Sequence, residues 1–511
     1  MFKRMLSIII AISVMLAVCS VRIYFIGKGD LKSVANGQST YTMQIAGLRG
    51  RIYDCNKTPF TNNVKQYGAV LIPTVKTVAA VTSQLDGEVR KNILSSLSQN
   101  TPCLANVTKD FNCTDAFVFE NYQSSTVVCP HTIGYLDIDN NAVTGIEYAF
   151  DDVLKGENIN ISYAVDANKR PLDSHSLKVE NAQKNENYVQ LTLDLPLCKF
   201  TENLMKTKVK KGSAVVIDSN TGEIKCMVST PYFDTKNVSN YLYDEDAPLI
   251  NRSLENFNVG SVFKICVCAA ALKKGISNLK SYECKGSIKI GENTFNCSKS
   301  HGLTDMSKAL SVSCNCYFIR LAEEVGAENI YDMCIRLGFN RSVTLADTLK
   351  ADEGVLPSIY EITNYPAALA NFSFGQGELM LSPLHICAMI SAVNNSGKYK
   401  TPYLVKEVNN NGKCTYYNQS DETVVLNSTQ SEVLKQMLCE VIKSGTGKLA
   451  QPENGVAFGK TATAEGGEGK NQCWFAGGYK NYAIVVLCED GVSGGQDAAP
   501  VFKSICDYLG S

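Results

Sequence analysis

An uninterrupted apolar run in the middle of the chain constrains the fold more than any other feature. The run from Ile265 to Leu272 is rich in alanine, and neither Gly nor Pro interrupts it before Gly275. Such a run predicts a buried helix that begins near Ser261. Residues three apart share one face of a helix, so we expect the Lys264 amine to lie beside the Ser261 hydroxyl.

The pairing of Ser261 with Lys264 indicates nucleophilic catalysis. A serine needs a base beside it, and a lysine can serve once burial or neighbouring cations lower its pKa. Backbone N–H groups at the start of the predicted helix would favour negative charge that develops near Ser261. We therefore expect an acyl-enzyme on Ser261. The same spacing occurs again at Ser277 and Lys280, so the pair needs partners to be distinctive.

The partners follow in order along the chain. Ser313-Cys314-Asn315 comes next, and Lys460-Thr461-Ala462-Thr463 comes near the C-terminus. Ser-x-x-Lys, then Ser-x-Asn, then Lys-Thr-Gly is the motif set of penicillin-binding proteins and class A β-lactamases. The third motif departs from that pattern at Ala462. Isolated Ser-x-Asn and Lys-Thr matches occur elsewhere, and only order, spacing and flanks distinguish this set from them.

The residues around these motifs resemble a class B penicillin-binding protein, over nearly the whole chain beyond its N-terminal apolar segment. The flanking strings are Asn251-Arg252, Gly260-Ser261-Val262-Phe263-Lys264-Ile265, Ser313-Cys314-Asn315-Cys316-Tyr317-Phe318, Gly375-Gln376-Gly377 and Gly459-Lys460-Thr461. Further upstream, three strings are similar to pieces of the family's N-terminal pedestal domain: Gly50-Arg51-Ile52-Tyr53-Asp54, His131-Thr132-Ile133-Gly134-Tyr135 and Gly145-Ile146-Glu147. The resemblance implies a membrane-anchored D,D-transpeptidase that cross-links bacterial peptidoglycan.

The resemblance also implies an α+β fold, the penicillin-binding or serine-transpeptidase fold. In that fold an antiparallel sheet carries helices on both faces and a helical subdomain, and an elongated pedestal and one transmembrane helix precede it. The residues agree, because strands are expected on both sides of the turn at 218–223 and again in 473–487, with helices between them. The expected domains are a cytoplasmic tail (1–4), a transmembrane anchor (5–26), a pedestal (27–207) and a transpeptidase domain (208–511).

The resemblance assigns a role to each catalytic residue. Ser261 would attack the carbonyl of the penultimate D-Ala of a stem peptide and release the terminal D-Ala, while Lys264 takes the serine proton. Ser313 would relay a proton to the leaving amine, and Asn315 would hold the substrate amide. Lys460 would supply a positive field from a facing strand. An amine of a second stem peptide would then resolve the ester.

The same resemblance implies how substrate is bound. The backbone N–H groups of Ser261 and Thr463 would form the oxyanion hole, and the hydroxyls of Thr461 and Thr463 would bind the terminal carboxylate. The expected ligands are stem peptides ending in D-Ala-D-Ala and β-lactams, with no cofactor. We expect a membrane glycosyltransferase as partner, and the residues leave open whether the chain serves division, elongation or sporulation.

The N-terminal apolar segment predicts a membrane anchor. Lys3 and Arg4 precede a run without charge from Met5 to Val21, and Arg22 can place its charged head at the interface. Positive charge before the run favours a cytoplasmic N-terminus, which would place the catalytic domain outside the plasma membrane. The alternatives are a signal peptide cleaved near Cys19 and a lipid attached to Cys19.

Charge and cysteine usage bear on other classes of function. The net charge of −1 gives no field that would attract nucleic acid. Many of the 20 cysteines lie in apolar runs, where thiols serve as small core residues, so we expect no disulfide scaffold. Cys284 and Cys297 flank a predicted hairpin and are the first pair to test for a disulfide. Without Cys-x-x-Cys or His-Glu-x-x-His we expect no metal site, and we expect His301 to be a structural loop residue.

Three alternative functions remain. A β-lactamase would use the same motifs but needs an activated water, and no Glu-x-x-x-Asn loop lies at the usual place between Asn315 and Lys460. A D,D-carboxypeptidase differs only in its acceptor, and a catalytically silent scaffold would act through the pedestal.

Ala462 bears on activity as well. Because side chains alternate along a strand, we expect its methyl to face the substrate channel together with Lys460.

Overall fold

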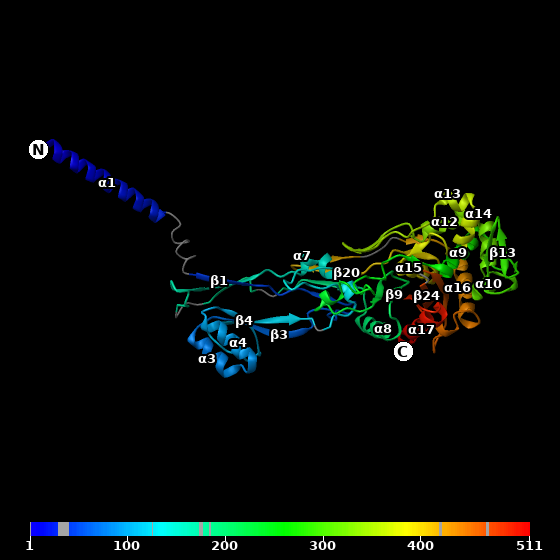
Figure 1. The fold of residues 1–511 in the computed structure, drawn as a ribbon, viewed down its shortest axis with the longest axis horizontal. Coiled ribbons are helices and arrows are strands. Elements are labelled where there is room, and N and C mark those ends of the chain that lie inside the picture. The colour runs from blue at the N-terminus through cyan, green and yellow to red at the C-terminus, as the bar shows by residue number, and fades with distance from the viewer. Residues whose placement is uncertain are drawn as a thin grey trace. The chain divides into compact units, whose positions relative to one another are not determined.

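The computed structural model describes residues 2–28, 40–124, 126–172, 177–182, 185–417, 422–466 and 470–511 (Figure 1). The chain packs as two compact units, each assembled from separate segments. The first comprises Met1–Arg49, Asn63–Gln123 and Lys155–Asn185, and the second comprises Gly50–Asn62, Ser124–Leu154 and Glu186–Ser511. All the predicted site residues belong to the second unit.

The chain begins with one long apolar helix. α1 (Phe2–Lys28) contains the predicted anchor at 5–26, and its most apolar 18-residue window has a mean hydropathy of 2.4. Among the described residues, none buries any part of this helix. A helix of this length and composition can cross a membrane. The predicted pedestal begins at residue 27, so its first two residues belong to α1, and residues 29–39 lie outside the described part of the chain.

The first unit is built on two small antiparallel sheets. One has the order β1 (Thr40–Ile45), β6 (Ile159–Ala164), β7 (Lys178–Glu180), and the other has the order β4 (Cys103–Val107), β3 (Val64–Leu71), β5 (Ala116–Gln123). Helices α3 (Val75–Gln84) and α4 (Gly87–Ser98) pack against each other and α4 contacts β4. Their apolar side chains and those of β3 form one small core, which includes Leu71, Val81, Ile93 and Leu97.

The second unit is organised around a five-stranded antiparallel sheet. Its strand order is β10 (Ile224–Thr230), β9 (Gly212–Asp218), β25 (Tyr482–Glu489), β24 (Asn471–Tyr479), β23 (Ala457–Glu465). β9 and β10 form the predicted hairpin, and β25 from the far end of the chain pairs with β9, with Val485 opposite Val215. The prediction of a sheet that pairs its termini is therefore confirmed.

Helices cover both faces of this sheet (Figure 1). On one face α8 (Leu195–Lys208) and α17 (Ala499–Gly510) contact each other and the strands, and on the other lie α9 (Lys264–Lys274), α15 (Pro383–Asn394) and α16 (Ser428–Lys443). The helical subdomain adds α10 (Met306–Ser311), α11 (Asn315–Val325), α12 (Ala327–Arg336), α13 (Ile359–Asn364) and α14 (Pro366–Ser373). The predicted α+β fold class is confirmed.

Short antiparallel strand pairs connect these helices. They are β11 (Phe257–Asn258) with β18 (Met380–Leu381), β12 (Tyr282–Cys284) with β15 (Gly302–Thr304), β13 (Ser287–Ile290) with β14 (Asn293–Asn296), β16 (Val343–Ala346) with β17 (Leu349–Ala351), and β19 (Lys398–Lys400) with β22 (Glu422–Val424). The pair β13–β14 is the hairpin predicted between Cys284 and Cys297.

Three segments before residue 208 belong to the second unit. β2 (Arg51–Tyr53) and β8 (Tyr188–Leu191) pair with each other, and β8 continues to β20 (Val405–Asn410) and β21 (Lys413–Tyr416). The short helices α5 (Pro130–Ile133), α6 (Gly145–Ala149) and α7 (Asp151–Leu154) lie in the same unit. The compact units thus divide the chain differently from the predicted domains, whose boundary at 207 stays a prediction.

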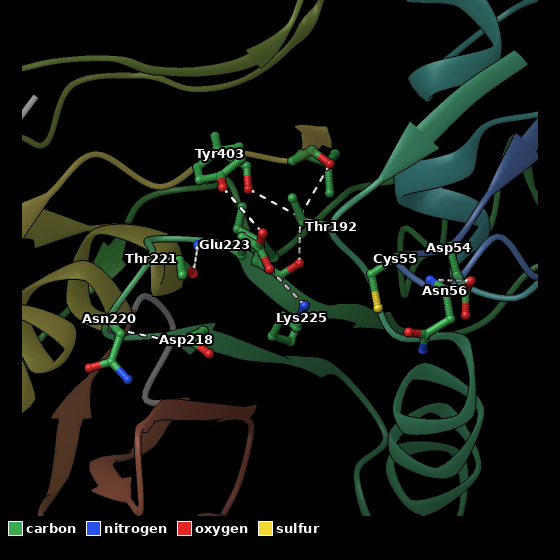
Figure 2. Close-up of polar contacts among 12 residues, drawn as sticks. Asp54, Cys55, Asn56, Thr192, Asp218, Asn220, Thr221, Glu223, Lys225 and Tyr403 are labelled. Atoms are coloured by element: carbon green, nitrogen blue, oxygen red, sulfur yellow. Dashed lines mark hydrogen bonds and ion pairs between the residues drawn. The ribbon is translucent and has the colours of Figure 1, made fainter. Parts of the chain in front are cut away.

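A polar network joins these early segments to the central sheet (Figure 2). The Thr192 hydroxyl donates to the Ile224 carbonyl at 2.7 Å and also lies 3.2 Å from the Tyr403 carbonyl. Lys225 forms an ion pair with Glu223 at 2.8 Å, and the Tyr403 hydroxyl donates to the same carboxylate at 3.3 Å. The loop after β8, the strand β10 and the segment before β20 are therefore held together.

Candidate active site

Ser261 lies in the first turn of the predicted buried helix. That turn is a 3₁₀ turn, η2 (Gly260–Phe263), and the α-helix proper, α9, starts at Lys264. The Lys264 side chain is fully buried, and its Nζ lies 3.0 Å from Ser261 Oγ. The predicted contact between the two residues is therefore present. Ser277, in the second Ser-x-x-Lys, is exposed instead, and its hydroxyl accepts from the Leu279 N–H.

Two glycines fix the turn that carries Ser261. Gly260 has φ +58°, and a Cβ there would lie 3.1 Å from the Ala464 Cβ. Its N–H donates to the Gly375 carbonyl at 3.0 Å. Gly375 has φ +80°, and a Cβ there would lie 2.0 Å from the Gly260 carbonyl oxygen. Both positions therefore need glycine, for backbone conformation and for close approach.

Ser313 and Asn315 complete a hydrogen-bonded set around Lys264. Ser313 precedes α11 with φ +57°, a conformation that a serine adopts at an energetic cost. Its hydroxyl donates to Ser261 Oγ at 3.0 Å, and Lys264 Nζ lies 3.0 Å from its carbonyl and 3.2 Å from its hydroxyl. Lys264 also donates to Asn315 Oδ1 at 2.7 Å, and the Asn315 amide donates to the Asn296 carbonyl at 3.0 Å.

The environment of Lys264 prepares it to act as a base. Burial disfavours the ammonium form and lowers its pKa to about 8. At pH 7 about a tenth of the Lys264 side chains are then neutral amines, 3.0 Å from the Ser261 hydroxyl. The arrangement can remove a proton from Ser261 as the serine attacks an acyl group.

β23 carries the third motif at the edge of the central sheet. Lys460 is fully buried, and its Nζ donates to the Thr461 carbonyl at 2.9 Å. Burial, and then the charge of Lys264, hold the pKa of Lys460 well below its usual range. Within the described chain, no hydrogen bond joins Lys460 to Ser261, Lys264, Ser313 or Asn315. The geometry therefore leaves its field-supplying role as a prediction.

A cavity of about 360 Å³ lies beside Ser261. Ser261, Ser313, Asn315, Thr461 and Thr463 all line it. The two threonines point away from Lys460: the Thr461 hydroxyl is 2.6 Å from that of Thr446, and the Thr463 hydroxyl accepts from the Gly494 N–H at 3.2 Å.

Five residues that line the cavity are not among the predicted site residues, namely Ser298, Val312, Thr446, Ser493 and Gly495. Thr446 lies in the Ser444-Gly445-Thr446-Gly447 turn that precedes β23 along the chain. No motif marks Ser298, which follows Cys297 in the loop after β14.

The expected orientation of Ala462 is wrong. Ala462 borders the cavity, but its side chain is 3% exposed, and a Cβ on Gly260 would lie 3.4 Å from its methyl. Alternation correctly places Lys460 and Ala462 on one face of β23. That face, however, packs against η2, and the side chains of Lys460 and Ala462 on it are buried. Thr463, on the opposite face, is exposed.

All 20 cysteines lie in the described part of the chain, and all are free thiols, Cys284 and Cys297 included. Four groups capable of binding a metal nevertheless gather beside the Ser313 turn, namely Cys284, Cys297, His301 and Cys314. The search for Cys-x-x-Cys and His-Glu-x-x-His passed over them, because their spacing matches neither pattern. His301 therefore lies in a cluster of potential metal ligands together with three cysteines.

Comparisons with known proteins agree with the motifs. The family model described as penicillin binding protein transpeptidase domain matches residues 212–507. Stage V sporulation protein D of Bacillus subtilis (strain 168) is 27% identical over 87% of this chain and 73% of its own length. Peptidoglycan D,D-transpeptidase MrdA of Acinetobacter baumannii is 26% identical over 71% of this chain and 59% of its own length.

Solved structures share the fold. Penicillin binding protein 3 from Mycobacterium tuberculosis, in its apo form, has a TM-score of 0.68 and 22% identity, over 91% of this chain and 96% of that one. A crystal structure of the same protein complexed with ampicillin has a TM-score of 0.68 and covers 95% of that chain. Because the family model spans more than half of the chain and the three motifs border one cavity, this chain belongs to the penicillin-binding protein transpeptidase family, as a class B penicillin-binding protein.

Proposed function

We propose that this protein is a serine D,D-transpeptidase that cross-links peptidoglycan stem peptides ending in D-Ala-D-Ala. The observation that carries the proposal is the hydrogen-bonded set of Ser261, Lys264 and Ser313 at the cavity. A silent scaffold would not need a buried lysine placed beside an accessible serine. The name of the relative MrdA, a peptidoglycan D,D-transpeptidase, supports the same reaction.

Acylation begins when neutral Lys264 takes the Ser261 proton and Oγ attacks the carbonyl of the penultimate D-Ala. The tetrahedral intermediate collapses, the peptide C–N bond breaks and the acyl group stays on Ser261 as an ester. Ser313, which is hydrogen-bonded to Lys264 and Ser261, relays the proton to the departing D-Ala amine. The amine of a second stem peptide then attacks the ester, which forms the cross-link and regenerates Ser261.

Substrate binding uses the edge strand and the Ser313 turn. We assign the terminal carboxylate to the Thr461 and Thr463 hydroxyls, which lie at the cavity, and the substrate amide to Asn315. Lys460 contributes positive charge from beneath β23 when it is protonated. The oxyanion would accept from the N–H groups of Ser261 and Thr463, since β23 is the last strand of its sheet.

The same serine should react with β-lactams, and this provides the test. The relative from Mycobacterium tuberculosis has been crystallised in complex with ampicillin. We expect a fluorescent penicillin to label the full-length protein once per chain, and Ser261→Ala to abolish the label without loss of fold. Ser277→Ala, in the exposed second motif, is the matched control and should label normally. Persistent labelling of Ser261→Ala would overturn the assignment.

Acceptor choice separates the remaining alternatives. A D,D-carboxypeptidase would pass the acyl group from Ser261 to water, and a transpeptidase passes it to an amine. Incubation with a stem-peptide thioester and D-amino acids distinguishes the two, because only aminolysis incorporates the added amine. A labelled but otherwise inert protein would point to the scaffold.

We further propose that α1 anchors the protein in the plasma membrane, with the N-terminus in the cytoplasm and both compact units outside. The apolar helix and the basic residues Lys3 and Arg4 at its start support this orientation. A membrane glycosyltransferase that makes the glycan strands is the partner we propose, since its product carries the stem peptides. Nucleic acid is not a proposed partner.

A further inference from the structure

Four side chains distant in sequence meet beside the catalytic turn. Cys284 ends β12, Cys297 follows β14, His301 precedes β15, and Cys314 is the N-cap of α11. Their three Sγ atoms and one imidazole nitrogen all lie within 4.8 Å of one another. Cys284 and Cys314 are 1% and 0% exposed, and Cys297 and His301 are partly buried.

The separations agree with the edges of a tetrahedron of metal ligands. Sγ of Cys297 lies 3.7 Å from Sγ of Cys314, and Sγ of Cys284 lies 3.4 Å from Nδ1 of His301. Zinc bonds of about 2.3 Å to sulfur and about 2.0 Å to nitrogen give tetrahedral edges of about 3.8 Å for S···S and about 3.5 Å for S···N. Both separations match these edges.

Hydrogen bonds orient two of the sulfur atoms and the imidazole. The Cys316 N–H donates to Cys297 Sγ at 3.3 Å, and the Tyr317 N–H at the start of α11 donates to Cys314 Sγ at 3.4 Å. His301 turns Nδ1 toward the sulfurs, and its buried Nε2 has no hydrogen-bond partner in the described chain, so Nε2 can carry the imidazole proton.

From these contacts we propose that Cys284, Cys297, His301 and Cys314 bind one Zn²⁺ ion in a closed Cys₃His site. Three thiolates and one neutral imidazole are a structural zinc set, with no position left for water. Binding releases the three thiol protons to solvent, and the metal takes the place of the S–H contacts between the cysteines. The site is structural and takes no part in the acyl transfer.

The position of the site explains what the ion would stabilise. The hairpin β13–β14 has only a small apolar core, in which Ile290 packs with Ile319 and Ala370. Cys284 and Cys297 flank this hairpin, and Cys314 lies between the active-site residues Ser313 and Asn315. One ion would therefore fix the hairpin to α11 and hold the strained Ser313 turn against Lys264.

Another close cysteine pair serves as a comparison. Cys266 Sγ lies 3.8 Å from Cys334 Sγ, yet in the described chain neither belongs to a group of three or more potential ligands. Two close thiols alone are therefore not evidence of a metal site. The Cys297–Cys314 pair differs because Cys284 and His301 lie beside it. Cys334→Ser is the matched control, because it removes a buried thiol from a pair without touching the proposed site.

The test measures metal, so its failure is distinguishable from failure of the proposed function. Full-length protein, purified in detergent with reductant and without chelator, should contain about one zinc per chain. Cys284→Ser and His301→Ala should each weaken Zn²⁺ affinity at least about tenfold, and Cys334→Ser should not. Co²⁺ in place of Zn²⁺ should give the intense visible absorption of a tetrahedral thiolate site in the parent and in Cys334→Ser.

A second measurement avoids variants that fail to fold. Chelator treatment of the unmodified protein should lower its penicillin acylation rate at least about tenfold, and added Zn²⁺ should restore it. Three results would overturn the proposal: no bound metal after incubation with Zn²⁺, a Cys297–Cys314 disulfide in place of bound metal, or unchanged zinc content in both site variants. Normal labelling of Ser261 alongside any of these would leave the transpeptidase assignment intact.

Discussion

The role of Lys264 as the base can be tested through pH, because burial lowers its pKa to about 8. Acylation needs the neutral amine, so the rate should rise about tenfold for each pH unit below 8 and level off above that. The measurement is the second-order rate of benzylpenicillin acylation from pH 6 to 9, with circular dichroism at each pH as the check on folding.

Lys264→Met is the companion variant. Met is unbranched and only one atom shorter than Lys but cannot accept the Ser261 proton, so acylation should slow by about 10² to 10⁴ and lose its rise with pH. Acylation within tenfold of the parent, with the same pH profile, would contradict the role of Lys264 and make Lys460 the next candidate base.

A second prediction at this scale concerns Ala462. Because its methyl packs against Gly260 and is buried, Ala462→Gly should change acylation by bulky cephalosporins and by benzylpenicillin equally, and by less than about tenfold. Glycine in a strand interior should also lower the free energy of unfolding by about 0.5–1 kcal/mol. A rate gain confined to the bulky drugs would show that the methyl narrows the channel after all.

Single residues also show where sequence reasoning succeeds and where it stops. The contact between Ser261 and Lys264 was predictable, because helix geometry brings residues three apart together. The burial of Ala462 was not, since alternation gives the face of a strand but not what packs on that face. The ligand cluster was not either: Cys284 and His301 lie 17 positions apart, and only the fold of the hairpin brings them together.

At the scale of elements, the site depends on the contact between the η2 turn and the loop at Gly375. Gly375→Ala places a Cβ 2.0 Å from the Gly260 carbonyl, so the turn carrying Ser261 must shift. We expect a lower unfolding free energy and slower acylation. Gly412→Ala is the matched control, because Gly412 has the same φ of +80° but a Cβ there meets no atom within 4 Å.

The control separates two costs. A left-handed alanine costs about 1–2 kcal/mol at either position. Any loss at Gly375 beyond that found at Gly412 therefore measures the clash with Gly260. Equal losses in stability, with acylation unchanged in both variants, would mean that the loop does not position Ser261.

The sequence predicts single strands and hairpins better than it predicts which distant strands pair. The hairpin β9–β10, the strands β24 and β25 and the hairpin β13–β14 follow from apolar runs around turns, and the structure confirms them. The pairing of β8 with β20 was not predicted, because its strands are separated by more than 200 residues and no local pattern encodes such a partner. The same long-range pairing places segments before residue 208 in the second unit.

At the scale of the whole molecule, the packing of α8 shows what a fragment that starts at residue 208 would lose. α8 buries Leu197, Cys198 and Met205 and contacts β10, so a fragment that starts at 208 exposes the sheet face beneath it. This observation bears on the predicted boundary at 207, which separates α8 from the strands it covers.

The last prediction concerns the membrane. If α1 is an uncleaved anchor with its N-terminus in the cytoplasm, a reporter enzyme active only outside the cytoplasm should be active when fused after Ser511. Detergent should be needed to extract the full-length chain, because α1 offers a long apolar surface that nothing in the described part of the chain buries. Deletion of residues 1–28 is the control and should give an inactive, cytoplasmic reporter. An exported chain that starts near Ser20 and needs no detergent would instead identify α1 as a cleaved signal, and penicillin labelling of Ser261 should be the same in either form.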